Sequence, residues 1–190
     1  MKNILIGVIV FILIITGTLF ATQLTSRHSN NNAAPGTAPI SPNVVILDRS
    51  GKGITKVSSA VYSKTDTTTL LLSDNAIQAL PSQMGKMTNV TVFKIDHNQL
   101  EGSLIGEIRQ MSQLKTLDAS YNNMTGIPAE LGQLHSLETL SYSHNKITGL
   151  PNELAQLKNN LKEFDLTGNP LTTEQISKLR ATLPNTKVIF

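Results

Sequence analysis

The chain of 190 residues has 16 basic and 13 acidic side chains, a formal net charge of +3 at pH 7, and no cysteine. The lack of cysteine excludes disulfides, thiolate zinc sites and thiol nucleophiles. Two basic residues, Lys2 and Arg27, precede residue 44, so residues 44–190 carry 14 basic and 13 acidic side chains, a net charge of +1. A charge this small gives no concentrated basic face, and we expect no nucleic-acid partner.

Residues 1–24 are predicted to be a membrane anchor. Ile4 to Phe20 form an almost uninterrupted apolar run without charge. About 17 to 20 such residues span the ~30 Å hydrocarbon core of a bilayer as one helix. Cleavage as a secretory signal peptide remains the alternative, although Leu19-Phe20-Ala21 lacks the pair of small residues that a cleavage site needs. We therefore expect a single transmembrane helix, or an uncleaved signal, in residues 1–24.

Residues 25–43 are predicted to form a flexible linker. Ser, Asn, Ala, Pro, Gly and Thr dominate them, and they show no periodicity. Lys2 favours a cytoplasmic N-terminus. This orientation predicts a single-pass membrane protein whose residues after the anchor are extracytoplasmic, whereas cleavage of the anchor would give a secreted protein.

An asparagine recurs along residues 67–171 at steps of 23, 24, 23 and 24 residues. One apolar residue lies two positions after each of these asparagines and another lies five positions before it, in the frame V/L-x-x-L/F-x-L-x-x-N-x-L. A repeat of this length indicates one supersecondary unit that buries its apolar face only by stacking on its neighbours. The five asparagines are Asn75, Asn98, Asn122, Asn145 and Asn169.

Each repeat is predicted to contain one strand, and the strands to form a parallel sheet. In residues 114–122, Leu117 and Ala119 alternate with polar residues, which is the period of a strand. The chain must then turn out of the strand, and an asparagine side chain has the donors and the acceptor that the backbone of such a turn needs. We expect the amides to form a continuous ladder, and the loss of one to leave buried polar groups unpaired at about 1 to 3 kcal/mol each.

The second half of each repeat has apolar residues spaced three and four apart, which predicts short helical or 3₁₀ segments on the convex side. Proline precedes these segments in three repeats and presets the backbone. Gly85 and Gly132 are expected to limit the length of the helices. The extra residues of the two longer repeats are expected within residues 98–104 and 157–161, in loops.

Both ends of the repeat array carry a predicted cap. Residues 44–66 form a degenerate first repeat, with Lys52 at the asparagine position. About five repeats follow in residues 67–171. Residues 172–190 form a C-terminal cap, in which the capping-box spacing Thr172-x-x-Gln175 starts a helix and the last residues add an edge strand. Because both caps are present, we expect the chain to be complete.

The repeated frame resembles the leucine-rich repeat family, over roughly residues 44–190. The resemblance implies an α/β solenoid with a parallel sheet on the concave face and short helical or 3₁₀ turns on the convex face. It also implies a scaffold that binds a protein partner. Extracellular repeats of this family in animals and plants usually carry disulfide caps, so the lack of cysteine favours a bacterial-type member.

The outward strand positions form the surface on which this family usually binds partners. Across the repeats this surface is polar and mildly acidic, with Tyr121 at its centre between His97 and His144. With strands ~4.8 Å apart, the two histidines should lie about 10 Å from each other, too far to share a metal. A central tyrosine is a suitable anchor for a protein or a surface glycan. The candidate partner-binding residues are Lys94, Asp96, His97, Asp118, Tyr121, Ser141, His144 and Asp165.

Tyr142 occupies an inward position that other repeats give to aliphatic residues. In the preceding repeat that position holds the small Ala119. We expect the Tyr142 ring to fill the space beside Ala119 and its hydroxyl to reach the edge of the core.

No acid, base and nucleophile can be assembled from this sequence, and no phosphate loop or pair of metal ligands occurs in it. We therefore expect no catalytic residue, metal or cofactor. The leading hypothesis is a membrane-tethered recognition module that binds a protein or a surface polymer through its concave sheet. A secreted, soluble effector or inhibitor is the alternative, and cleavage after residues 1–24 would separate the two.

Overall fold

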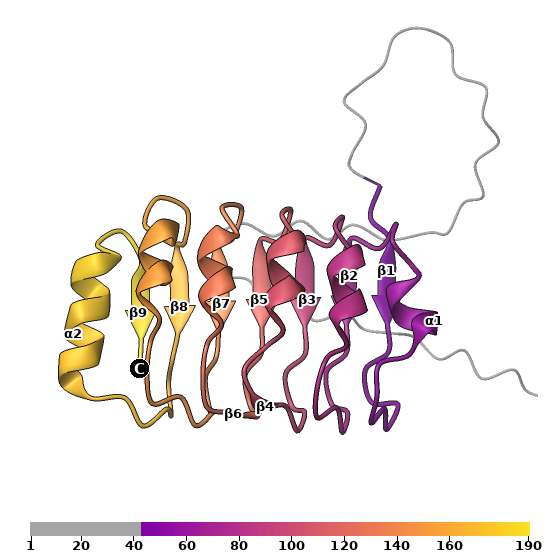
Figure 1. The fold of residues 1–190 in the computed structure, drawn as a ribbon, viewed down its shortest axis with the longest axis horizontal. Coiled ribbons are helices and arrows are strands. Elements are labelled where there is room, and N and C mark those ends of the chain that lie inside the picture. The colour runs from indigo at the N-terminus through magenta and orange to yellow at the C-terminus, as the bar shows by residue number, and fades with distance from the viewer. Residues whose placement is uncertain (1–42) are drawn as a thin grey trace, which may run out of the picture. The chain divides into compact units, whose positions relative to one another are not determined.

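The computed structural model describes residues 43–190 (Figure 1). The predicted anchor, residues 1–24, and almost all of the predicted linker lie outside the described residues. Within residues 43–190 none of the helices has both the length and the apolar character needed to cross a membrane.

Seven short strands form one parallel sheet in the order β1-β2-β3-β5-β7-β8-β9. Neighbouring strands pair 23 or 24 residues apart, so that Leu70, Phe93, Leu117, Leu140 and Phe164 stack in one row of the core. The predicted α/β solenoid and its register are therefore confirmed. The strands are β1 (Ile46–Asp48), β2 (Thr69–Leu71), β3 (Val92–Lys94), β5 (Thr116–Asp118), β7 (Thr139–Ser141), β8 (Glu163–Asp165) and β9 (Lys187–Ile189).

Four 3₁₀ helices lie over one face of the sheet, on the convex side (Figure 1). Three of them begin directly after a proline, whose extended backbone leads into the first turn. The two extra residues fall where they are predicted: one beside the short pair β4 (Glu101–Gly102) and β6 (Asn123–Met124), the other in the turn after the last 3₁₀ helix. The 3₁₀ helices are η1 (Ser82–Lys86), η2 (Gly106–Gln110), η3 (Ala129–Gln133) and η4 (Asn152–Leu157).

Two of these 3₁₀ helices contain a glycine next to their last residue. Gly85 lies in η1 and Gly132 lies in η3. A Cβ on Gly132 would lie 2.3 Å from the backbone oxygen of Glu153 in η4. Glycine is therefore required there by the close approach of consecutive 3₁₀ helices.

The core is one continuous apolar cluster between the sheet and the 3₁₀ helices. Tyr142 fills the inward position beside Ala119 as predicted, but both are fully buried. Within residues 43–190 its hydroxyl makes no hydrogen bond, and it does not reach the edge of the core, so that part of the prediction is wrong. Burial raises the pKa of Tyr142 well above its usual value of 10.0.

A strand and a helix lie at each end of the repeat array. At the N-terminal end β1 pairs with β2, with Leu47 opposite Leu70, and α1 (Ser59–Tyr62) follows it. At the C-terminal end α2 (Thr173–Thr182) begins with a complete capping box between Thr172 and Gln175. β9 then adds the last strand of the sheet.

The repeating asparagines join consecutive repeats through the backbone. The Nδ2 of Asn122 donates to the carbonyl oxygens of Ile95, Ala119 and Ser120 at 3.0 to 3.2 Å, and its Oδ1 accepts from the Leu100 N–H at 2.9 Å. Ile95 and Leu100 belong to the preceding repeat. The amides therefore form a ladder through the main chain of their neighbours and not by bonding to one another. Asn75, Asn98, Asn145 and Asn169 likewise bond to the preceding repeat.

Candidate partner-binding surface

The eight candidate residues lie on the concave side of the solenoid, in or just after strands β3, β5, β7 and β8. Lys94, His97, Tyr121 and His144 are exposed. The other four, Asp96, Asp118, Ser141 and Asp165, are half-buried. The strand register places Lys94, Asp118, Ser141 and Asp165 in one row across the sheet.

Tyr121 is stacked between the two histidines. Its ring centroid lies 4.3 Å from that of His97 and 4.2 Å from that of His144, with interplanar angles of 12° and 8°. The three rings form a continuous aromatic column, His97–Tyr121–His144, across three repeats. Because both faces of the Tyr121 ring are covered by its neighbours, a partner can reach Tyr121 only at its ring edges. Tyr121 is nevertheless 46% exposed, so those edges are open to solvent.

The backbone of the aromatic column is in the left-handed region. His97, Tyr121 and His144 have φ of 52°, 52° and 54°. The alternation of the repeat predicts these residues to be outward strand positions, but they lie in the turn that follows each strand, and this is a correction. Histidine visits positive φ more readily than most residues, whereas a bulky tyrosine there is an outlier. Asp74, at the same place in the preceding repeat, also has a positive φ of 57°, so the turn of the repeat imposes this conformation.

Gly168 takes the same place in the last repeat, with φ of 74°. A Cβ on it would lie 3.2 Å from Cδ2 of His144. The His144 ring therefore covers the glycine backbone, and a side chain at residue 168 would press against the end of the aromatic column.

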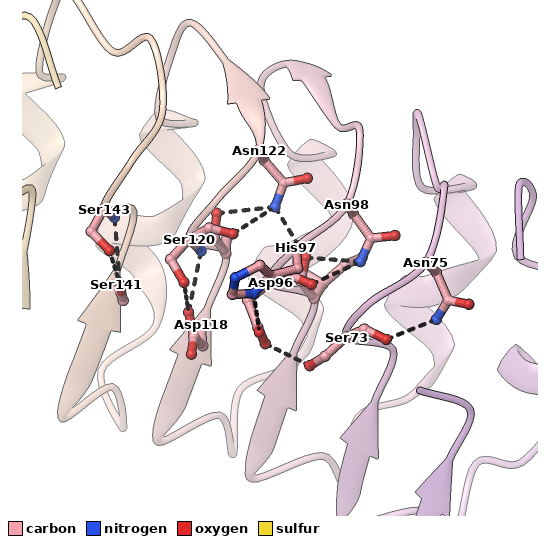
Figure 2. A network of polar contacts seen from close by, with 12 residues as sticks. Ser73, Asn75, Asp96, His97, Asn98, Asp118, Ser120, Asn122, Ser141 and Ser143 are labelled. Carbon is pink, nitrogen blue, oxygen red and sulfur yellow. Dashed lines mark hydrogen bonds and ion pairs between the residues drawn. The ribbon is translucent and has the colours of Figure 1, made fainter. Parts of the chain in front are cut away.

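Asp96 fixes the first ring of the column (Figure 2). Its Oδ2 lies 2.9 Å from Nδ1 of His97, and its Oδ1 accepts a 2.5 Å hydrogen bond from the Ser73 hydroxyl. In a serine nucleophile site the histidine would take the serine proton. Here the serine hydroxyl donates to the carboxylate, so Ser73, Asp96 and His97 orient a ring and do not form that constellation.

Two further aspartates are held by residues two positions along the chain. Oδ1 of Asp118 accepts from the Ser120 hydroxyl at 2.6 Å and from its N–H at 3.2 Å (Figure 2). Asp165 binds Thr167 in the same way, at 2.6 and 2.9 Å. These carboxylates are therefore oriented before any partner arrives, which lowers the entropic cost of binding.

Two serines in the row next to these aspartates are covered. Ser120 and Ser143 are both buried. Ser120 is covered where it bonds to Asp118, and the Ser143 hydroxyl lies 3.3 Å from that of Ser141 (Figure 2). These two serines therefore support the row of Lys94, Asp118, Ser141 and Asp165 and offer little contact area of their own.

The parallel sheet, the 3₁₀ helices and the asparagine ladder form a solenoid like those of leucine-rich repeat proteins, and comparisons with known proteins find the same likeness. The family described as Leucine rich repeat matches residues 112–171. A solved leucine-rich repeat protein of Leptospira interrogans is 26% identical, with a TM-score of 0.57, over 72% of this chain and 40% of that chain. No curated protein matches the chain significantly.

A second solved structure is the leucine-rich repeat ectodomain of the plant membrane receptor kinase GASSHO1/SCHENGEN3 from Arabidopsis thaliana, in complex with CASPARIAN STRIP INTEGRITY FACTOR 2. It is 24% identical, with a TM-score of 0.63, over 75% of this chain and 17% of that chain. At this identity the likeness shows the fold alone. The chain spans less than half the length of either of these proteins.

Proposed function

We propose that this chain is a recognition module that binds a protein partner through its concave sheet, centred on the aromatic column His97–Tyr121–His144. The observation that carries the proposal is Tyr121, a bulky residue held at positive φ with its edge exposed between two stacked histidines. Packing in the core does not require this ring. An aromatic residue at the centre of a contact patch commonly contributes 2 kcal/mol or more to binding.

The polar residues around the aromatic column support this proposal. Asp118 and Asp165 use Oδ1 to bind their own turn, and Oδ2 of each accepts no hydrogen bond within residues 43–190. Lys94 is exposed in the same row. Rigid aromatic anchors with oriented polar neighbours are typical of protein interfaces. A surface glycan is the second ligand class that such a surface could accept.

We further propose that residues 1–24 tether the module to a membrane, with the repeats extracytoplasmic, and that the protein is of bacterial type. Support for the tether comes from the apolar run Ile4 to Phe20. Support for a bacterial source comes from the lack of cysteine and from the likeness to the Leptospira protein.

Capture experiments with full-length Tyr121→Asn and His135→Asn variants test the binding proposal. Asparagine tolerates positive φ, so Tyr121→Asn removes the ring without adding backbone strain. His135 is exposed on the turn after η3, on the convex side, and serves as the matched control. We expect partners captured from cell-surface extract by the wild type to be lost with Tyr121→Asn and kept with His135→Asn. The opposite pattern would overturn the proposal.

A further inference from the structure

The seven-stranded sheet has two edges. β1 is its first strand and β9 its last, and the two lie at opposite ends of the row of strands (Figure 1). Within residues 43–190 β1 pairs only with β2, and β9 pairs only with β8. The outer side of such a strand presents backbone N–H and C=O groups to which another chain can add a strand. Each edge is therefore a place where a second copy of the chain could extend the sheet.

Exposed apolar side chains gather at these two edges. Val44, just before β1, and Ile46, in β1, are 63% and 54% exposed, and Phe190, directly after β9, is 55% exposed. In the described part of the chain the only other exposed large apolar residue is Tyr121. Edge strands that expose apolar side chains are prone to aggregate. The two edges thus need a feature that keeps a further strand away.

The outer edge of β1 is covered by an arginine. The Arg49 N–H donates to the carbonyl oxygen of Leu71 at 2.8 Å, so the backbone of residue 49 faces β2. Because the backbone groups of successive residues point to opposite sides of a strand, the carbonyl oxygen of Asp48 faces away from the sheet. Nη1 of Arg49 donates to this oxygen at 3.0 Å. The guanidinium therefore occupies the hydrogen-bond acceptor that a strand added to β1 would use.

The outer edge of β9 has the same cover from another element. The Lys187 N–H donates to the repeat of β8 at 2.8 Å, and the carbonyl oxygen of Ile189 accepts from that repeat at 2.8 Å, so both residues face β8. The carbonyl oxygen of Val188 between them faces away from the sheet. Nη2 of Arg180, in α2, donates to it at 3.3 Å. The Arg180 guanidinium also lies over the exposed Phe190 ring, with Cζ 4.6 Å from the ring centroid. One side chain thus covers an outward carbonyl group and an apolar surface.

The position of Arg49 in the repeat supports a role at the edge. The register pairs Asp48 with Leu71, so Arg49 takes the place that Leu72 has in the next repeat. The residues of this row inside the array are buried, and an unpaired arginine among them would be costly. Arg49 is exposed, because at the edge of the sheet its side chain can turn out of the core toward the outer carbonyl group. The buried residues of the row are Leu72, Ile95, Ala119, Tyr142 and Leu166.

We propose that Arg49 and Arg180 close the two edges of the sheet against strand addition by a second copy of this chain. An incoming strand would have to displace each guanidinium from its carbonyl oxygen and take it out of water beside apolar side chains. Charged side chains protect the edge strands of other sheets in this way. The proposal concerns association of the chain with itself and does not depend on recognition through the concave sheet.

Alanine variants at the two edges test the proposal in the full-length chain, kept in solution with mild detergent. Native mass spectrometry counts the copies in each complex. Arg49→Ala and Arg180→Ala should each double the copy number of the wild type, because one open edge per chain joins two copies. The double variant should form a series of larger complexes, since two open edges per chain allow open-ended growth. Arg109→Ala is the matched control, because Nη1 of Arg109 also donates to a backbone oxygen, that of Gly106, but within η2 on the convex side.

Hydrogen exchange of the edge amides, followed by NMR, separates strand addition from aggregation of unfolded protein. The Val188 N–H faces away from the sheet and should exchange about tenfold or more slowly in complexes of Arg180→Ala than in the wild type. The Ile46 N–H should respond in the same way to Arg49→Ala, whereas unfolding would speed exchange throughout the repeats. A double variant with the copy number of the wild type, an equal effect of Arg109→Ala, or larger complexes without slowed exchange at residues 46 and 188 would overturn the proposal.

Discussion

Gly132 and the backbone oxygen of Glu153 lie so close together that a Cβ on residue 132 would stand 2.3 Å from that oxygen. The contact joins η3 and η4, two of the 3₁₀ helices that cover the convex side of the core. Because the obstacle is backbone, it cannot rotate away as a side chain could. The close approach of η3 and η4 on the convex side therefore depends on the absence of a Cβ at Gly132.

Gly132→Ala should lower the free energy of unfolding by about 1 to 3 kcal/mol, the usual cost of overpacking. Helix propensity alone predicts the opposite sign, since alanine is about 1 kcal/mol better than glycine in a helix. Gly126→Ala is the control, because a Cβ there would meet nothing within 4 Å. Guanidinium denaturation measures the change in unfolding free energy for both variants. Equal midpoints would show that the close contact between η3 and η4 relaxes without cost.

Asn122→Ala should destabilise the repeats by at least about 2 kcal/mol, because it leaves the buried Leu100 N–H and several carbonyl groups without a partner. Asn123→Ala, one residue away, should cost less than about 1 kcal/mol, since its side chain makes no hydrogen bond within the described residues. Thermal melts followed by circular dichroism measure both. Similar shifts for the two variants would refute the ladder register.

Tyr142→Phe should stabilise the protein by about 1 kcal/mol or more at pH 8, because it removes a buried hydroxyl that has no hydrogen-bond partner in the described part of the chain. Burial raises the pKa of Tyr142 in the folded state. The unfolded chain therefore loses that proton first, and wild-type stability should fall by about 1.4 kcal/mol per pH unit above pH ~10.

Denaturation of wild type and Tyr142→Phe at pH 8 and at pH 11 checks both parts of this prediction. The gap in unfolding free energy between the two proteins should widen at the higher pH, since the other tyrosines are common to both. A constant gap would show that the hydroxyl finds a proton acceptor or water in the folded state.

The native protein should retain residues 1–24. The apolar run Ile4 to Phe20 is long enough to span a bilayer, and Leu19-Phe20-Ala21 is a poor cleavage site. Intact-mass spectrometry of protein isolated from its cells, in the membrane fraction and in the medium, measures this directly. A mature form that begins near Thr22 and accumulates in the medium would favour the secreted alternative.

Periodicity is enough to predict the register of this fold because the pattern repeats. Leu70, Phe93 and Leu117 recur in one frame, and the strands pair them in that register. The same frame places Lys52 opposite Asn75, the first of the repeating asparagines. The Lys52 N–H donates a hydrogen bond to Oδ1 of Asn75. Stacked repeats contact only their neighbours, so a local pattern specifies the global structure.

The features that escaped prediction depend on distances and dihedral angles that a period does not contain. The pattern puts His97, Tyr121 and His144 in one row, but it cannot show that the row follows the strands at positive φ with the rings stacked. Glycine at the corresponding place, Gly168, was the available signal, because glycine often marks positive φ. Likewise the space around Tyr142 depends on the three-dimensional packing of several repeats.

Site-specific photo-crosslinking in intact cells tests the central claim, recognition through the concave sheet, most directly. A photoreactive residue placed at Lys94, exposed on the concave side, is compared with one at Gln83, exposed on η1 of the convex side. We predict a discrete crosslinked product from position 94 that disappears when Tyr121→Asn is added, and none from position 83. A product from position 83 without one from position 94, or no product from either, would contradict the claim.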